Sequence, residues 1–163
     1  KSKQGKGSTF TVTIPCRKAS EDDSLVKKNS NQSNKNCLNG VRILLVEDNE
    51  INTEIATELL TEEGCIVETA NDGVVCIDMI EKAEADYYKM ILMDIQMPVM
   101  NGYDAALIIR KMKDTKKARI PIIAMTANAF AEDAQKVLSV GMNAHVAKPV
   151  DMNILVPTMM KYL

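Results

Sequence analysis

The sequence of 163 residues has no tryptophan, a single histidine and only two phenylalanines, and it contains no long apolar run. No stretch approaches the roughly 18 consecutive apolar residues of a membrane-spanning helix, and the first residues do not resemble a secretory signal peptide. We therefore expect a cytoplasmic chain without direct membrane contact. Because the chain begins with Lys1 and not with methionine, we expect a fragment, and any inner-membrane anchor of its parent protein would lie upstream.

Charge and cysteine usage argue against two further classes of protein. The 20 Lys and Arg residues against 22 Asp and Glu residues give a net charge of -2, which leaves no basic footprint for nucleic acid. The four cysteines form no Cys-X-X-Cys pair and have no histidine nearby in the sequence, which disfavours structural zinc and predicts reduced thiols. They are Cys16, Cys37, Cys65 and Cys76.

The first 39 residues differ in composition from the rest. In residues 9–14, Thr alternates with Phe, Val and Ile, which is the period-two pattern of a strand with one buried face. One strand cannot form a sheet alone, so we expect its partner strands to lie outside this sequence. Residues 16–39 are rich in Ser, Asn, Lys and Asp, a composition that predicts a flexible linker.

From residue 40 to the end, short apolar runs alternate with helical patterns. Strands and helices in this alternation predict right-handed βαβ crossovers and a parallel sheet covered on both faces. Residues 40–163 are therefore predicted to form one α/β domain, a doubly wound (βα)5 fold with five parallel strands. The apolar runs are Arg42–Val46, Cys65–Thr69, Met90–Asp94, Ile120–Thr126 and Asn143–Ala147. The helical stripes are Ile51, Ile55 and Leu59; Val74, Ile77 and Ile80; and Phe130, Ala134, Val137 and Leu138.

Two glycines mark predicted helix ends, and one proline falls inside a predicted helix. Gly64 and Gly141 each follow a helical pattern, at positions where glycine readily adopts the left-handed conformation that ends a helix. Pro157 lies within the last helical segment. Because proline lacks the amide hydrogen that the helix interior needs, we expect it to kink or shorten that helix.

Polar residues follow four of the five predicted strands, at the point where each strand ends. Glu47 and Asp48 follow the first strand, Asp94 ends the third, Thr126 ends the fourth, and Lys148 follows the fifth. Each has an ordinary explanation by itself, as a turn residue, a helix cap or a solvated amine. The carboxyl ends of parallel strands meet at one edge of a sheet, however, so we expect these side chains to lie close together.

Three carboxylates at one edge would repel one another unless a cation lies between them. Mg2+ favours one or two carboxylates, a carbonyl oxygen and retained waters, and it shares phosphate oxygens as ligands. An ionised Asp94 beside such an ion, the Lys148 ammonium and the Thr126 hydroxyl is set up as a nucleophile toward phosphorus. Phosphoryl transfer needs positioning and charge neutralisation more than a strong base, so the sequence predicts an aspartyl phosphate.

Four segments resemble the receiver domain of two-component response regulators, in the same order and spacing. The similarity spans residues 41–163 and implies the flavodoxin-like receiver fold. Residues 1–15 resemble the last hairpin of the ATP-binding domain of sensor histidine kinases, without its nucleotide-binding segments. Together these resemblances imply the receiver of a hybrid sensor histidine kinase. The four segments are Val46–Asn52 (VEDNEIN), Met93–Gly102 (MDIQMPVMNG), Met125–Asn128 (MTAN) and Gly141–Pro149 (GMNAHVAKP).

The resemblance assigns the phosphorylation chemistry by position. Asp94 matches the phospho-accepting aspartate, Thr126 matches the hydroxyl residue that turns toward the phosphoryl group, and Lys148 matches the lysine that pairs with that group. The bond between Lys148 and Pro149 is typically cis in receivers, which is plausible because a cis bond before proline costs only ~1 kcal/mol.

The resemblance also assigns a Mg2+ site and the partners of the domain. Glu47, Asp48 and Asp94 match its carboxylates, with Asp48 favoured over Glu47 as a direct ligand, and the carbonyl of Gln96 matches the backbone ligand. The implied function is phosphorelay. A phosphohistidine on a kinase dimerisation domain donates the phosphoryl group, which passes to a histidine phosphotransfer domain or to water. The fragment would assist its own phosphotransfer and hydrolysis, while the parent would be the kinase.

One position departs from the family pattern. Three residues before the lysine, receivers carry Tyr or Phe as a rotameric switch coupled to the threonine, and here that residue is His145. We expect His145 to be a hydrogen-bonded strand residue and not a catalytic group. Whether aromatic switching transmits the signal in this chain is left open by the sequence.

Three alternative functions remain to be weighed. A pseudo-receiver that docks on a kinase through its first helix would work without phosphorylation, but the complete acidic set argues against it. An aspartyl phosphatase or phosphomutase generally carries a second Asp two residues after the nucleophile, where this chain has Gln96. A flavodoxin-like cofactor binder is disfavoured because no phosphate-binding loop rich in Gly, Ser or Thr follows the first strand.

Overall fold

The computed structural model describes residues 2–3, 7–8, 11–12, 38–127 and 131–163, and the chain divides into two units, Lys1–Asn34 and Lys35–Leu163. In the first unit, β1 (Ser2–Lys3) pairs antiparallel with β2 (Gly7–Ser8). Of the strand predicted over residues 9–14, Thr11 and Val12 are exposed and belong to no strand, while the others lie outside the described residues. The assignment of residues 1–15 and 16–39 to a kinase strand and a linker stays a prediction.

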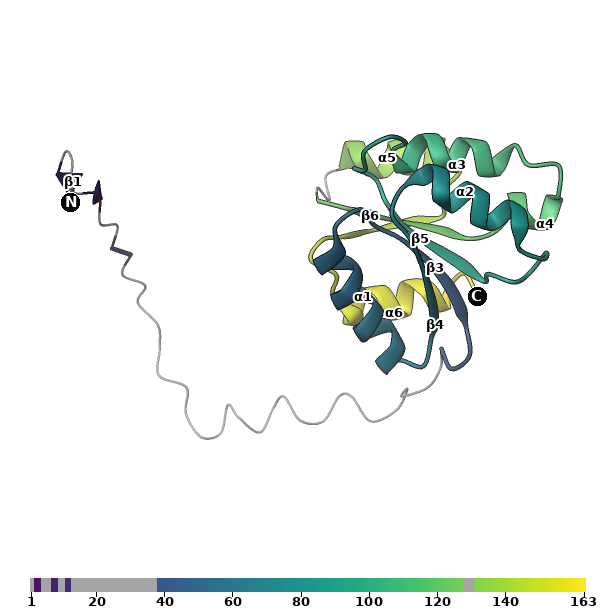
Figure 1. Ribbon diagram of the computed structural model, residues 1–163, viewed down its shortest axis with the longest axis horizontal. Helices are drawn as coiled ribbons and strands as arrows, with labels where there is room; N and C mark the ends of the chain where they lie inside the picture. The colour runs from purple at the N-terminus through teal and green to yellow at the C-terminus, as the bar shows by residue number, and fades with distance from the viewer. Residues whose placement is uncertain (1, 4–6, 9–10, 13–37, 128–130) are drawn as a thin grey trace. The chain divides into compact units, whose positions relative to one another are not determined.

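The second unit contains a five-stranded parallel sheet in the order β4-β3-β5-β6-β7 (Figure 1). This order and the intervening helices confirm the predicted doubly wound α/β fold. Strands β3 and β5 have the predicted bounds, whereas the other three begin one or two residues later than predicted. The strands are β3 (Arg42–Val46), β4 (Ile66–Ala70), β5 (Met90–Asp94), β6 (Ile122–Thr126) and β7 (Ala144–Ala147).

Side chains that alternate along the strands build two separate cores, one on each face of the sheet. In β3, Ile43 and Leu45 pack on the side of α1 and α6, while Leu44 and Val46 pack on the side of α2, α3 and α5 (Figure 1). All five residues of β5 are buried, as expected for a central strand covered on both faces. The helices are α1 (Glu50–Glu62), α2 (Gly73–Lys82), α3 (Gly102–Arg110), α5 (Ala131–Ser139) and α6 (Met152–Met160).

The helices α1 and α5 end where the sequence predicts, but the apolar stripe of α1 does not face the core. Gly64 and Gly141 follow α1 and α5 with φ of 91° and 86°, which confirms them as the terminating glycines. In α1, the buried residues are Ala56 and Leu60, whereas Ile51 and Ile55 are 67% and 53% exposed. Helical spacing therefore identified the helix correctly, while tertiary packing placed Ala56 and Leu60 against the sheet and left the isoleucines outside.

Two other features concern short helical segments. The last helix runs through Pro157 to Met160, so the proline does not end it. A four-residue helix α4 (Thr115–Ala118) precedes β6 and was not predicted. An ion pair of 2.5 Å from Lys116 to Asp86 joins α4 to the segment that follows α2.

Among the described residues, no helix combines the length and apolar character needed to cross a bilayer.

Gly102 lies where the chain passes directly over the end of β5. A Cβ added to Gly102 would overlap the backbone oxygen of Asp94 and would lie 2.9 Å from Cγ of Met93. The amide of Gly102 donates to the oxygen of Ile95 at 3.1 Å, which fixes this close approach. A side chain at residue 102 would therefore displace the backbone that carries Asp94.

We predict that Gly102→Ala lowers the free energy of unfolding by about 2 kcal/mol, because the added methyl group overpacks a backbone that cannot move away. The thermal midpoint should fall by roughly 5–10 °C, measured by circular dichroism. Gly40→Ala is the control, since nothing lies within 4 Å of its added carbon and only its φ of 75° opposes the substitution. An equal or smaller loss for Gly102→Ala than for Gly40→Ala would contradict the close approach.

Candidate functional site

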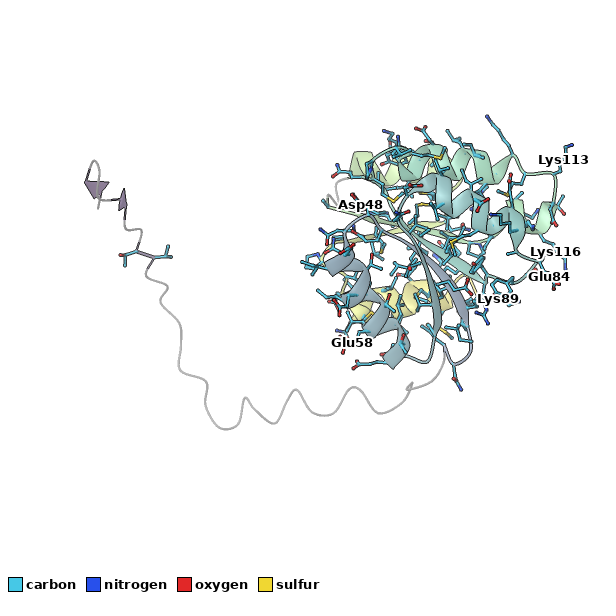
Figure 2. The ribbon with its side chains drawn as sticks, viewed as in Figure 1. Asp48, Glu58, Glu84, Lys89, Lys113 and Lys116 are labelled. Carbon is cyan, nitrogen blue, oxygen red and sulfur yellow. The ribbon has the colours of Figure 1, made fainter. Side chains whose placement is uncertain are left out.

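Polar side chains gather where the parallel strands end. Glu47 follows β3, Asp94 ends β5 and Thr126 ends β6; these are the buried polar residues of the described chain, with 4%, 5% and 7% exposure. Asp48 is exposed beside them, and Figure 2 shows it at the opposite end of the sheet from Lys89, which precedes β5. Burying carboxylates is unfavourable unless they are paired and hydrogen-bonded, so their partners decide what the site can do.

Lys148 bridges the two buried carboxylates. Its Nζ donates to Oδ2 of Asp94 at 2.7 Å and to Oε2 of Glu47 at 2.5 Å, and its side chain is only 20% exposed. The Lys148 amide donates to the carbonyl oxygen of Thr126 at 2.8 Å, and its bond to Pro149 is cis, as the resemblance implied. Backbone and side chain together hold this ammonium against Asp94.

The same contacts keep Lys148 charged. Burial by itself would lower the pKa of Lys148, but the hydrogen bonds and charge attraction from Asp94 and Glu47 outweigh burial and raise that pKa above its usual value. The stability that these contacts provide is therefore present at neutral pH and is lost only in strongly alkaline solution, as pH rises through the raised pKa.

The carboxylates still outnumber the ammonium. One oxygen each from Glu47, Asp48 and Asp94 lies within 4.8 Å of the others. Three negative charges and the one positive charge of Lys148 (-3 + 1) leave a net charge of -2. At an effective dielectric constant of 20, each pair of charges at 4 Å repels by about 4 kcal/mol. A divalent cation would neutralise the cluster, and this all-oxygen donor set suits Mg2+.

The remaining predicted site residues lie around this cluster. The backbone amide of Gln96 donates to Oδ1 of Asp94 at 3.0 Å, while the Gln96 residue itself is exposed. His145 is half-buried in β7, paired in register with Ala124 of β6. The structure thus brings Glu47, Asp48, Asp94 and Lys148 together, with Thr126 at the adjoining strand end; their roles stay predictions.

An apolar groove of about 330 Å3 opens beside the cluster and was not predicted. Its apolar lining comes from one side of α1, from β6 and from the segment after β7. Glu47, Asn52 and Lys148 form its polar part, and Lys148 is the residue that donates to Asp94. Its apolar lining is Ile55, Ala56, Leu59, Met125, Pro149 and Val150.

A family profile described as the response regulator receiver domain matches residues 43–159. The chain belongs to this family. Residues 43–159 include all the residues of the cluster, so the geometry above is that of a receiver domain.

Similar proteins are receivers attached to histidine kinases. The receiver domain is 39% identical over 132 residues to hybrid signal transduction histidine kinase B of Dictyostelium discoideum, a match that covers 75% of this chain and 7% of that protein. The match with this chain spans only 7% to 18% of the length of these curated relatives. The structure is similar to the receiver domain of sensor histidine kinase PA1611 from Pseudomonas aeruginosa PAO1, with a TM-score of 0.67 and 36% identity, covering 76% of this chain and 97% of that one. That relative has a magnesium ion coordinated in its active-site cleft.

A second solved structure is similar at 27% identity and a TM-score of 0.69, over 77% of this chain and 90% of that one. It is a co-crystal structure, from Saccharomyces cerevisiae, of the histidine phosphotransfer protein Ypd1 with the receiver domain of its downstream response regulator Ssk1. That relative therefore shows a receiver domain bound to a histidine phosphotransfer protein.

Asn52 contacts the site, and the sequence did not single it out. Its Nδ2 donates to Oε1 of Glu47 at 2.8 Å. The sequence does place Asn52 near the site, because it lies in the quoted VEDNEIN segment, five residues after Glu47. A side chain in the first turn of the helix that follows a strand can reach back to the strand end, but spacing alone cannot say which residue it reaches.

We predict that Lys148→Ala lowers the free energy of unfolding by about 2 kcal/mol in the absence of divalent ions, because it leaves adjacent carboxylates without their cation. Millimolar Mg2+ should reduce the difference from wild type. Thermal unfolding in EDTA and in Mg2+ measures both effects. Lys82→Ala is the control, since Lys82 pairs with Asp78 at a site where its side chain is 74% exposed and should contribute under about 1 kcal/mol. Equal losses for the two variants would contradict the proposed neutralisation.

Proposed function

We propose that this receiver domain accepts a phosphoryl group on Asp94 from a phosphohistidine and passes it to a histidine phosphotransfer domain or loses it to water. The observation that carries the proposal is the Lys148 ammonium, 2.7 Å from Asp94 and 2.5 Å from Glu47, beside a cluster of three carboxylates. Family membership supports phosphorelay chemistry at this position.

Asp94 and Lys148 have different roles in the transfer of the phosphoryl group. An oxygen of Asp94 attacks phosphorus, so that an O–P bond forms while the P–N bond to the donor imidazole breaks. The electron pair of that bond stays on the imidazole nitrogen, which takes up a proton from water. Lys148 stabilises the charge on the phosphoryl oxygens, because it already lies within hydrogen-bonding distance of Asp94. A second histidine nitrogen removes the group by the reverse bond change. Water removes it when its oxygen bonds phosphorus as the Asp94 O–P bond breaks, which gives inorganic phosphate and a proton.

The carboxylates of Asp48 and Asp94, together with Glu47 and the carbonyl of Gln96, would hold a Mg2+ ion. When bound, the ion neutralises the residual negative charge and binds phosphoryl oxygens. The net charge of -2 in the cluster supports this assignment, as does the magnesium ion in the cleft of the PA1611 receiver. We further propose that the Thr126 hydroxyl turns toward the phosphoryl group and that His145 occupies the switch position beside it.

The surrounding protein is part of the same proposal. Residues 1–15 would end the ATP-binding domain of a hybrid sensor histidine kinase, residues 16–39 would be a linker, and residues 40–163 are its receiver. The donor would be the phosphohistidine of the kinase dimerisation domain. The receiver would act in the cytoplasm, with any inner-membrane anchor carried elsewhere in the parent. No observation favours a phosphorylation-independent pseudo-receiver over this function.

We predict that Asp94→Asn abolishes labelling of the receiver domain by acetyl phosphate or phosphoramidate in Mg2+, because the amide is not a nucleophile toward phosphorus. Intact-mass spectrometry of the wild type should show the mass of one phosphoryl group, and EDTA should suppress it. The control is Asp104→Asn, a carboxylate in the first turn of α3 that bonds Asn101 and should leave labelling unchanged. Undiminished labelling of Asp94→Asn would refute the site.

The docking face for the histidine donor is proposed to be the groove beside α1. A phosphohistidine must reach Asp94, and the groove lies beside Glu47 and Lys148, the residues next to Asp94 in the cluster. Ile55, which lines the groove, is 53% exposed, and Ile51 on the same helix is 67% exposed. The Ypd1 complex of the Ssk1 receiver supports a partner of the phosphotransfer class.

We predict that Ile55→Asp slows phosphoryl transfer from a phosphorylated histidine phosphotransfer protein by about tenfold or more, because it places a charge in the apolar contact. Labelling by acetyl phosphate should not change, since that donor needs no docking. The matched control is Leu138→Asp on α5, which is 60% exposed against 53% for Ile55 and lies on the other face of the sheet (Figure 1). If both variants slow the transfer equally, docking does not depend on α1.

A further inference from the structure

Both carboxylate oxygens of the buried Glu47 are held by other side chains. Oε1 accepts a hydrogen bond of 2.8 Å from Nδ2 of Asn52, and Oε2 accepts the 2.5 Å bond from Lys148. Glu47 is 4% exposed, so neither oxygen can exchange its partner for water without cost. The orientation of this carboxylate therefore depends on Asn52 at one end and on Lys148 at the other.

These bonds continue to the phosphorylation site. Lys148 donates to Oδ2 of Asp94 at 2.7 Å, so Asn52, Glu47, Lys148 and Asp94 form one uninterrupted chain of polar contacts. A lysine ammonium sits on a flexible four-carbon stem, and its position is set by the oxygens that it bonds. A fixed Glu47 thus fixes Lys148, and Asn52 is the group that prevents Glu47 from rotating away.

Capping of α1 does not account for the Asn52 side chain. The N-cap bond of this helix runs from the Asn52 backbone amide to Oδ1 of Asn49, at 3.1 Å, and does not use the Asn52 carboxamide. In α6, Asn153 also lies in the first turn, as the second residue where Asn52 is the third of α1, and its carboxamide bonds locally to Asp151 at 2.9 Å. The Asn52 carboxamide instead reaches out of its helix to a carboxylate of the site.

We propose that Asn52 is a positioning residue for phosphoryl transfer, which acts by orienting Glu47 so that Lys148 stays beside Asp94. The proposal rests on the proposed function, since it assigns Asn52 a part in the chemistry of Asp94. Asn52 itself contacts neither Asp94 nor the phosphoryl group in this role. Its effect is transmitted through the two bonds of Glu47.

The first test compares phosphorylation rates with acetyl phosphate at saturating Mg2+, a donor too small to depend on docking. Asn52→Ala should slow labelling by about tenfold, the loss expected when one hydrogen bond to a charged group is removed. Asn52→Asp keeps the shape of the side chain but replaces the donor by a carboxylate facing Glu47, so it should slow labelling at least as much. Asn153→Ala, the matched control in α6, should label at the wild-type rate.

Thermal unfolding separates this role from a structural one. An aspartate in the first turn of a helix is favourable toward the helix dipole, so Asn52→Asp should remain folded even where labelling is slow. Slow labelling of a stably folded Asn52→Asp variant supports the proposal. Wild-type labelling rates for both Asn52 variants would overturn it.

The second test is a double-mutant cycle with Lys148→Ala. If Asn52 acts through Lys148, adding Asn52→Ala to Lys148→Ala should slow labelling by less than about twofold beyond Lys148→Ala alone. A further tenfold loss would overturn the proposal, because the two residues would then act independently. Failure of the proposed function looks different, since the wild-type domain itself would not be labelled or Asp94→Asn would be labelled normally.

Discussion

The receiver domain depends on one electrostatic constraint, namely that an excess of carboxylates at one edge of the sheet must be held together. Lys148 satisfies part of it, bonding Asp94 and Glu47 at 2.7 and 2.5 Å. The remaining charge of -2 favours the binding of a divalent cation. The positive charge of that cation in turn favours the binding of a negatively charged phosphoryl group. The excess negative charge that is unfavourable in the free protein therefore favours a divalent cation as its ligand. A cluster with balanced charges would lack this electrostatic attraction.

The fold brings about this excess of charge through backbone features that carry no charge themselves. The strand β5 is buried over all five residues, so Asp94 has no route to solvent except at the strand end. The turn that follows is so compressed that a Cβ at residue 102 would overlap the Asp94 carbonyl oxygen. Only glycine fits there. Lys148 is also positioned by its backbone, because its amide donates a hydrogen bond to the Thr126 carbonyl.

Much of this arrangement could be predicted from the sequence, for specific reasons. Apolar runs such as Met90–Met93 show no alternation, which identifies strands buried on both faces, and parallel strands bring their ends to one edge regardless of loop detail. The residue order alone therefore suffices to place Glu47, Asp94 and Lys148 together. The contact of Asn52 with Glu47 could not be predicted, because it depends on how α1 leaves β3. The short helix α4 was missed because four residues are too few to show a helical period, and its ion pair to Asp86 joins distant segments.

The outward stripe of α1 is informative, because it separates two meanings of a periodic apolar pattern. Periodicity shows that one side of a helix is apolar, but not that this side faces the core. In α1 the sheet is contacted by Ala56 and Leu60, while Ile51 and Ile55 stay exposed. Exposed apolar residues that border a groove are typical of interaction sites, and Ile55 lines the groove that also contains Glu47, Asn52 and Lys148. One helix thus carries the proposed partner's contact on its outer side and Asn52 in its first turn.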